Sequence, residues 1–476
     1  MTPLFSKLKT KKIQQYKFVL ILLVFVVFIF ISYEPDFGYL DTIHELLSIV
    51  AGEPINASFP IIFYQSAYVD YRFDPPRLRI FTLNKCVKNT QFLLADLHFN
   101  GDNSAPVRKN IYGKPLEGNC PSPLPPAVPC VYNSYQFSIG LRTNEDLKKV
   151  TIHLGSRRVD FNVQKIFKKT TKGITVCLQP VYYYSQWQNI VLYIEAWRAQ
   201  GATRFIVYFH SATKETWRTL EYYRDLGMIE IKPWPSFPSL PIDIADKYPK
   251  VDDSVYINAY YLAMNICILD IKTTLGTIAD FDEVMVPTKG RLLDYATKEM
   301  KGTKVGALAF DNHYTSFTPR IDTSNFSGVA SPKFNFYSGP YKYVFNASVI
   351  HVAQVHWAAS FTDSSMRSKI TDGALLHFRY NAEDRNGTTS EKNFRFFPDD
   401  HSTHIKNIED TAHKLFNGVM PTFSSKSNDA LQECVNKVIP VEDKVCLSTS
   451  GICKAEMDKV NDWVYAESEL LFLVAT

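Results

Sequence analysis

The pattern of hydrophobic and polar positions changes near residue 173. From there on, short apolar runs of strand length alternate with longer segments of helical length, two of which close at Gly201 and Gly227. This alternation is typical of a parallel sheet with covering helices, and so of the α/β class. The pattern predicts strands at 174–178, 204–209, 228–232 and 275–279, and helices at 188–199, 214–225 and 255–269.

The preceding segment, 55–172, consists of short β-rich runs such as 77–83 and 150–154, with a Pro-rich loop at 121–129. We interpret this segment as a β-rich accessory domain. The length of the chain supports the division, because 476 residues exceed what one hydrophobic core usually serves.

After the predicted α/β domain at 173–421, residues 422–476 form a Cys-containing extension. Its apolar run at 470–474 is far too short to cross a bilayer. We therefore expect this run to be a docking strand or the end of a helix.

The N-terminus carries lysines followed by an unbroken apolar run at 18–31. Because lysines stay on the cytoplasmic side, this pattern predicts a cytoplasmic tail at 1–17, a transmembrane signal anchor at 18–33 and a stem at 34–54. A cleaved signal peptide is the alternative, although Ser32, Tyr33 and Glu34 offer no small-x-small cleavage site. In either case most of the chain faces the secretory lumen.

All eight cysteines lie beyond this apolar run, which suits a compartment where disulfides form. Their spacing lacks the ligand pattern of structural zinc. The closest pairs in sequence are Cys120 with Cys130 and two of the last three, Cys434, Cys446 and Cys453. The net charge of +4 is spread without long single-sign runs beyond the N-terminal lysines, so nucleic-acid binding has no support.

Two acidic residues, Asp280 and Asp282, follow the last predicted strand. At positions i and i+2 they share one face of extended backbone. Carboxylates suit Mg²⁺ and Mn²⁺, which leave coordination positions open for phosphate oxygens, so the pair predicts a clamp for a nucleotide diphosphate. The pattern alone is weak, since about one or two Asp-x-Asp pairs arise by chance in such a chain, and a solvated strand end is the alternative.

Several stretches in a fixed order resemble glycosyltransferase family 92. They are VCLQPVY at 176–182, GATRFIVY at 201–208, Cys267, and DFDEVMVP at 280–287. The resemblance extends from about Tyr64 to Tyr380, and implies a GT-A-like mixed sheet flanked by helices. It also implies a type II Golgi or ER membrane protein that uses Mn²⁺, or Mg²⁺, to transfer galactose from UDP-galactose to glycoprotein or glycolipid glycans.

Within this resemblance we expect Asp282 to ligate the metal directly, and Asp280 to act through the ribose or a metal-bound water. His377 follows an apolar strand and is the candidate third ligand, with a core-edge imidazole as the alternative. Arg379 is the candidate partner of the diphosphate, or else closes a structural ion pair. Glu283 points to the other face of a strand and is read as a supporting or structural acid.

For the uracil of the donor we predict contacts with Pro180 and Tyr182, although aromatic residues here suit a core equally well. For the catalytic base, Asp372 is our choice among the acids downstream of the metal motif. The other candidates are Asp363, Glu383 and Asp384. His351 and His356 are interpreted as structural.

The sequence thus predicts a metal-dependent glycosyltransferase. Val284 and Ile266 depart from the family pattern, so a catalytically silent member that binds glycans or other partners is the alternative. A nucleotide-sugar hydrolase would share the metal site but would admit water where the acceptor binds.

Overall fold

A computed structural model gives the fold of the chain. It describes residues 53–475 except 56–58, 86, 88–89, 101–104, 118–129, 143–145, 322–325, 337–338, 379–387, 390–393, 400, 422–423, 439–445, 447 and 468–471. The described residues all belong to one compact unit, 52–476. The predicted tail, anchor and most of the stem lie outside the described residues. Among the helices that are described, none is long and apolar enough to cross a membrane.

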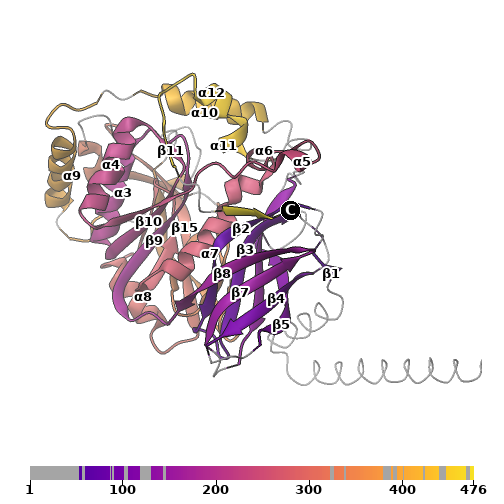
Figure 1. Cartoon of the computed structure of the whole chain (residues 1–476). Helices are drawn as coiled ribbons and strands as arrows, with labels where there is room; N and C mark the ends of the chain where they lie inside the picture. Colours follow the sequence, from indigo (N-terminus) through magenta and orange to yellow (C-terminus); the bar gives the residue numbers. More distant parts are fainter. Residues whose placement is uncertain are drawn as a thin grey trace, which may run out of the picture. The chain divides into compact units, whose positions relative to one another are not determined.

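The accessory segment forms a sheet that closes on itself, because β4 pairs with both β5 and β7 (Figure 1). Its side chains alternate, and the inward ones build a separate apolar core. The predicted strands at 77–83 and 150–154 fall within β3 and β7 and are confirmed. The strands are β1 (Glu53–Pro54), β2 (Ile61–Asp70), β3 (Arg77–Lys85), β4 (Gln91–Phe99), β5 (Val107–Pro115), β6 (Tyr132–Gly140), β7 (Leu147–Leu154) and β8 (Arg157–Ile166).

The second sheet begins with parallel strands in the order β12-β10-β9-β13. The four predicted strands of the α/β pattern match these elements. They are β9 (Thr171–Val181), β10 (Ala202–Phe209), β12 (Ile229–Pro233) and β13 (Thr273–Ile278).

Beyond β13 the sheet continues through antiparallel pairs, together with one parallel pair between β15 and β20, so the predicted mixed α/β sheet is confirmed. They are β17 (Lys342–Asn346), β15 (Val305–Ser316), β16 (Lys333–Phe336), β21 (Thr388–Thr389), β14 (Glu283–Val286) and β20 (Arg367–His377). Short pairs stand apart at β11 (Ser211–Ala212) with β22 (Val464–Tyr465), and at β18 (Ile350–Ala353) with β19 (Ala358–Phe361).

Helices cover both faces of the mixed sheet. Along β9, Val176 and Leu178 face the core shared with α3, whereas Cys177 faces the core shared with α7 and forms a disulfide with Cys267 of that helix. The predicted helix at 255–269 starts later than expected, at Tyr260. The helices around the sheet are α3 (Trp187–Ala199), α4 (Lys214–Asp225), α5 (Ile242–Ala245), α6 (Val251–Ser254), η1 (Tyr256–Ala259), α7 (Tyr260–Asp270), α8 (Leu292–Met300) and η2 (Ser327–Ala330).

Helix α7 also packs against the accessory strands, so one apolar core joins the two sheets (Figure 1). A buried ion cluster strengthens the contact between the two sheets. Arg72 forms an ion pair with the Asp70 carboxylate, and its Nη1 donates to the Ala347 carbonyl at 2.8 Å. Burial alone would raise the pKa of Asp70, but Arg72 and Arg79 outweigh it and lower the value to about 2.

The C-terminal extension returns to both sheets (Figure 1). Its last strand pairs antiparallel with β2, from Ile61 opposite Ala475 to Tyr64 opposite Phe472, which confirms the expected docking strand. The elements after β21 are α9 (His401–Leu415), α10 (Lys426–Val438), α11 (Thr449–Ile452), α12 (Lys454–Met457), β22 and β23 (Phe472–Ala475).

Disulfides tie the extension down. Cys434 bonds Cys453, as the proximity of the last three cysteines predicted. The expectation that Cys130 pairs with Cys120 is wrong, because Cys130 bonds Cys446, 316 positions away. Folding of the extension onto the body of the protein brings these two sulfurs together. The spacing of the cysteines in the sequence does not predict this pairing.

Candidate active site

The acidic motif lies in the tight connection between β13 and β14. Asp280 follows the carboxyl end of β13, the edge of an α/β sheet where ligands collect, and the Glu283 N–H donates to the Asp280 carbonyl at 3.0 Å. Strand β14 then pairs antiparallel with β20, in a register that sets Glu283 opposite His377. This register brings the predicted metal ligands together.

The imidazole Nε2 of His377 lies 3.2 Å from Oδ2 of Asp282. Two further contacts hold the pair in place: the Phe378 N–H donates to the Asp282 carbonyl at 2.9 Å, and the Asn312 amide nitrogen lies 3.4 Å from Nδ1 of His377. His377 is 4% exposed, so its ring has little freedom to turn away. Residues from β14, β15 and β20 therefore converge on one polar point.

A buried lysine that sequence reasoning missed balances the other two acids of the motif. Lys342, on β17, places Nζ 3.1 Å from Oε2 of Glu283 and 3.5 Å from Oδ2 of Asp280. Burial would lower the pKa of Lys342, but the two carboxylates outweigh it and raise the pKa well above its usual value. Glu283 also accepts from the Asp280 N–H at 3.0 Å, which fits its expected structural role.

These residues suit a divalent cation shared between protein and phosphate. Asp282 and His377 offer one oxygen and one nitrogen at hydrogen-bonding distance, as two ligands of a single ion would stand. Across the described part of the chain, no group of three or more His, Cys, Asp or Glu side chains is arranged to hold a metal. A pair of protein ligands leaves positions open for diphosphate and water oxygens, as is usual for Mg²⁺ at nucleotide sites.

Pro180 and Tyr182, the predicted uracil contacts, lie at the carboxyl end of β9, where they line a small cavity together with Trp234. The Tyr182 hydroxyl accepts a hydrogen bond from Thr449 of the C-terminal extension at 2.8 Å. His210 borders the same cavity, and burial lowers its pKa to about 4. The extension thus forms one wall of the region where the donor base was expected.

A strained turn forms another part of that wall. Ile257, Asn258 and Ala259 are consecutive non-glycine residues with φ of 43°, 51° and 57°. Left-handed backbone costs roughly 1–2 kcal/mol per residue, and such strain concentrates at functional sites. The turn is held by its partners, because the Asn258 carbonyl accepts from Trp234 Nε1 at 3.2 Å and its side-chain oxygen accepts from Ser450.

Two of the other predicted residues, Asp372 and Asp363, are not brought to this point. Asp372 is exposed and lies five positions before His377 on β20, roughly 17 Å along an extended strand, where Thr288 donates to it at 3.3 Å. Asp363 is held by Ser365 on an exposed turn. Arg379, Glu383 and Asp384 lie outside the described residues.

Several side chains have structural roles. His351 was interpreted from the sequence as structural, and its ring nitrogens lie 3.1 Å from side-chain atoms of Gln136 and of Ser360. His356 likewise bonds a backbone carbonyl, that of Tyr341, at 2.9 Å. The family-pattern departures Ile266 and Val284 are both fully buried in apolar cores, so they alter packing rather than the polar site.

Comparison with known proteins agrees with this geometry. A family model described as glycosyltransferase family 92 matches residues 172–416, just over half of the chain. None of the curated proteins compared with it matches the sequence significantly.

Three solved structures show partial likeness. Glucosyl-3-phosphoglycerate synthase from Mycobacterium tuberculosis, solved with Mn²⁺, UDP-glucose and phosphoglyceric acid, is 10% identical, over 54% of this chain and 82% of that chain, with a TM-score of 0.23. TarS 1–349 from S. aureus is 11% identical over 56% and 77%, with a TM-score of 0.26. A mycobacterial protein is 15% identical over 30% of this chain and only 41% of its own, with a TM-score of 0.19. These TM-scores are low, so the family match carries the assignment.

Proposed function

The chain belongs to glycosyltransferase family 92, and from this premise we propose that it is a metal-dependent enzyme that transfers galactose from UDP-galactose to glycans of glycoproteins or glycolipids. The observation that carries the proposal is the contact between Asp282 and His377, 3.2 Å apart at the carboxyl edge of the sheet.

Each residue of the site has a distinct task in this proposal. Asp282 and His377 bind the cation, and Asn312 keeps the imidazole turned toward Asp282. Lys342 supplies the counter-charge of Asp280 and Glu283, which preserves the shape of the loop and leaves Asp280 to contact the ribose or a metal-bound water. The bound cation would stabilise the charge that develops on the departing diphosphate.

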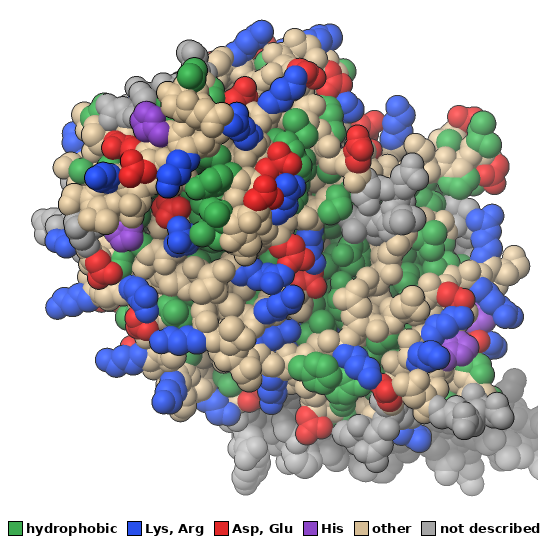
Figure 2. All heavy atoms as spheres, turned by 60° about the vertical axis from the view of Figure 1, so that its left-hand side comes forward, with side chains coloured by type: hydrophobic (Ala, Val, Ile, Leu, Met, Phe, Trp, Pro, Cys, Tyr) green, Lys and Arg blue, Asp and Glu red, His purple; other side chains and the backbone are tan. Residues whose placement is uncertain are grey.

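We further propose a Golgi or ER location, with the apolar run at 18–33 as a single-pass type II anchor and the catalytic domain in the lumen. The disulfides Cys130–Cys446, Cys177–Cys267 and Cys434–Cys453 support an oxidising compartment. On the face shown in Figure 2, Lys and Arg side chains are interspersed with Asp and Glu, a mixed surface that suits a neutral glycan better than a polyanion.

The test uses the full chain in detergent, with a panel of UDP-sugars, a mixed glycan pool, and either Mn²⁺ or EDTA. Transfer from UDP-galactose that EDTA abolishes is the expected result. Asp282→Asn should remove both transfer and Mn²⁺-dependent UDP binding. The matched control Asp363→Asn changes an exposed acid bonded to Ser365 and should retain both.

Full transfer in EDTA would overturn the metal-dependent mechanism. Turnover of donor without acceptor would instead indicate a hydrolase. A folded protein that binds no UDP would indicate a silent, glycan-binding member.

A further inference from the structure

A second pocket lies between the N-terminal turns of α3 and α4 and the C-terminal extension. Its free space, including the open mouth, is about 560 Å³. The lining is rich in hydroxyl and amide groups, which come from Ser185, Gln188, Thr213, Ser427 and Asn461. None of these residues takes part in the metal site, so the pocket calls for a separate explanation.

Gln188, in the first turn of α3, is the most informative of these residues. It is only 3% exposed, yet neither its amide nitrogen nor its amide oxygen has a hydrogen-bond partner among the described residues. A buried polar group left without partners costs about 1–3 kcal/mol. Gln186, the residue that caps this helix, also makes no side-chain capping bond within the described structure. This end of the pocket therefore offers donors and an acceptor that a ligand would satisfy.

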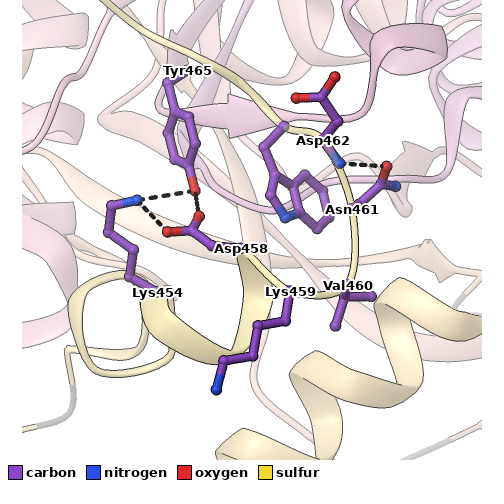
Figure 3. A pocket seen from close by; sticks show the side chains of 8 residues that line it. Lys454, Asp458, Lys459, Val460, Asn461, Asp462 and Tyr465 are labelled. Carbon is purple, nitrogen blue, oxygen red and sulfur yellow. Dashed lines mark hydrogen bonds and ion pairs between the residues drawn. The ribbon is translucent and has the colours of Figure 1, made fainter.

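The other polar groups are fixed in place by bonds across the pocket. The Ser185 hydroxyl donates to the side-chain amide oxygen of Asn428 at 3.0 Å. Asn461 donates from Nδ2 to Ser427 at 3.4 Å. Its side-chain oxygen accepts from the Asp462 N–H at 2.8 Å, a bond that Figure 3 shows in a view of the neighbouring pocket. Figure 3 shows Val460 beside Asn461 on the same loop, and Val460 adds an apolar contact to the lining.

The charges of the pocket lining indicate the chemical class of the ligand. The lining contains one acid, Glu215, and one base, Lys426, so the charges balance. Fixed amides and hydroxyls beside apolar side chains suit a neutral polyhydroxy compound, whose hydroxyls pair with the polar groups and whose C–H faces pack on Val460 and Pro421.

A residue next to the pocket in the sequence contacts the acidic motif of the metal site. Tyr184, the residue before Ser185, packs its ring 5.2 Å from that of Phe281, which stands between the two acids of the motif. One short segment thus connects the pocket to the site of the donor diphosphate.

We propose that this pocket binds a neutral sugar residue of the acceptor glycan. The assignment of that sugar as acceptor rests on the proposed transferase function, whereas its binding does not. The C-terminal extension thereby becomes part of the recognition surface.

The experiment measures binding of methyl glycosides to the full chain in detergent by saturation-transfer NMR, without donor. The probes are the methyl glycosides of galactose, N-acetylglucosamine, mannose and fucose. At least one should bind, and Gln188→Leu should weaken that binding about tenfold, the loss expected for one or two hydrogen bonds. The control Gln432→Leu, on the exposed surface of α10, should bind as the wild type does.

If Gln188→Leu does not fold, glycoside binding is tested with Asn461→Ala instead. This residue lies on an exposed loop, and its replacement should also weaken binding. Unchanged binding in the folded variant, or no binding of any probe to the wild type, would overturn the inference. Mn²⁺-dependent UDP binding is measured on the same samples. Failure of glycoside binding with UDP binding intact refutes only the pocket, and the reverse result refutes only the transferase.

Discussion

The imidazole of His377 stands 3.2 Å from the carboxylate of Asp282, although the two residues are 95 positions apart. The antiparallel register of β14 and β20 produces this contact, since it places Glu283 opposite His377 and so brings its neighbour Asp282 within reach. The separation is bridged by backbone pairing in the sheet, which makes the geometry rigid. Rigid placement is what a metal site requires.

Asn312→Ala should weaken Mn²⁺ binding in the presence of UDP by about 10- to 100-fold, the usual cost of removing a group that orients a metal-ligating histidine. Asn312 is buried and its amide nitrogen lies 3.4 Å from Nδ1 of His377. Calorimetric titration with Mn²⁺ measures the effect. Thermal unfolding of the metal-free variant provides the control, and an unchanged Mn²⁺ affinity would show that Asn312 does not position the ring.

Lys342→Met should lower the free energy of unfolding by about 3–5 kcal/mol, because it leaves Glu283 and Asp280 without their buried counter-charge. Urea denaturation measures this loss. The matched control is Lys369→Met, whose half-exposed ion pair with Glu299 should contribute less than about 1 kcal/mol. Equal stability of the two variants would contradict the role given to Lys342.

Glu117→Gln should change how stability depends on pH. Burial raises the pKa of Glu117 from 4.5 to about 7, so the folded state binds more protons than the unfolded state between these values. This group therefore makes the wild type lose stability as pH rises from 4.5 to 7, by about 3 kcal/mol in total, with no further effect above 7.

The glutamine stays neutral, and its carbonyl oxygen still accepts the bond that the Ser134 N–H donates to Glu117 at 2.9 Å. The difference in unfolding free energy between variant and wild type should accordingly grow in favour of the variant across this range. Urea denaturation at pH 4.5, 6 and 7.5 measures it. A constant difference would mean that Glu117 titrates normally.

Replacing Cys130 and Cys446 with Ala should lower stability by about 2–5 kcal/mol and release the segment that follows Cys446. Hydrogen exchange should then accelerate around α11 and β22. The double variant of Cys434 and Cys453, which closes a span of only 19 positions, is the comparison and should loosen a smaller region. Identical exchange profiles for the two variants would refute the separate role of the longer link.

Much of the fold was predictable because local pattern determines it. The strands β9, β10, β12 and β13 were found from short apolar runs, and Asp282 and His377 were found because each follows such a run. Lys342 was missed, since nothing in a single sequence distinguishes a buried lysine from the exposed majority.

Other features depend on contacts between distant parts of the chain. The pairing of Cys130 with Cys446, and the left-handed backbone at Ile257 to Ala259, become visible only once the C-terminal extension packs against that region. The choice of Asp372 as the catalytic base stays a prediction, and its position on β20, five residues before His377, became visible only in the structure.

The pairing of β23 with β2 also bears on the order of assembly during synthesis. Along Ile61–Tyr64, the edge of β2 that β23 covers stays open until residues 472–475 have been synthesised, while β3 and the rest of the accessory sheet are already available. An open strand edge is a template for pairing with other chains. A nascent chain stalled before β23 would therefore expose the unpaired backbone edge of β2. Chaperones in the compartment where the chain folds could recognise this edge as the mark of an incomplete molecule.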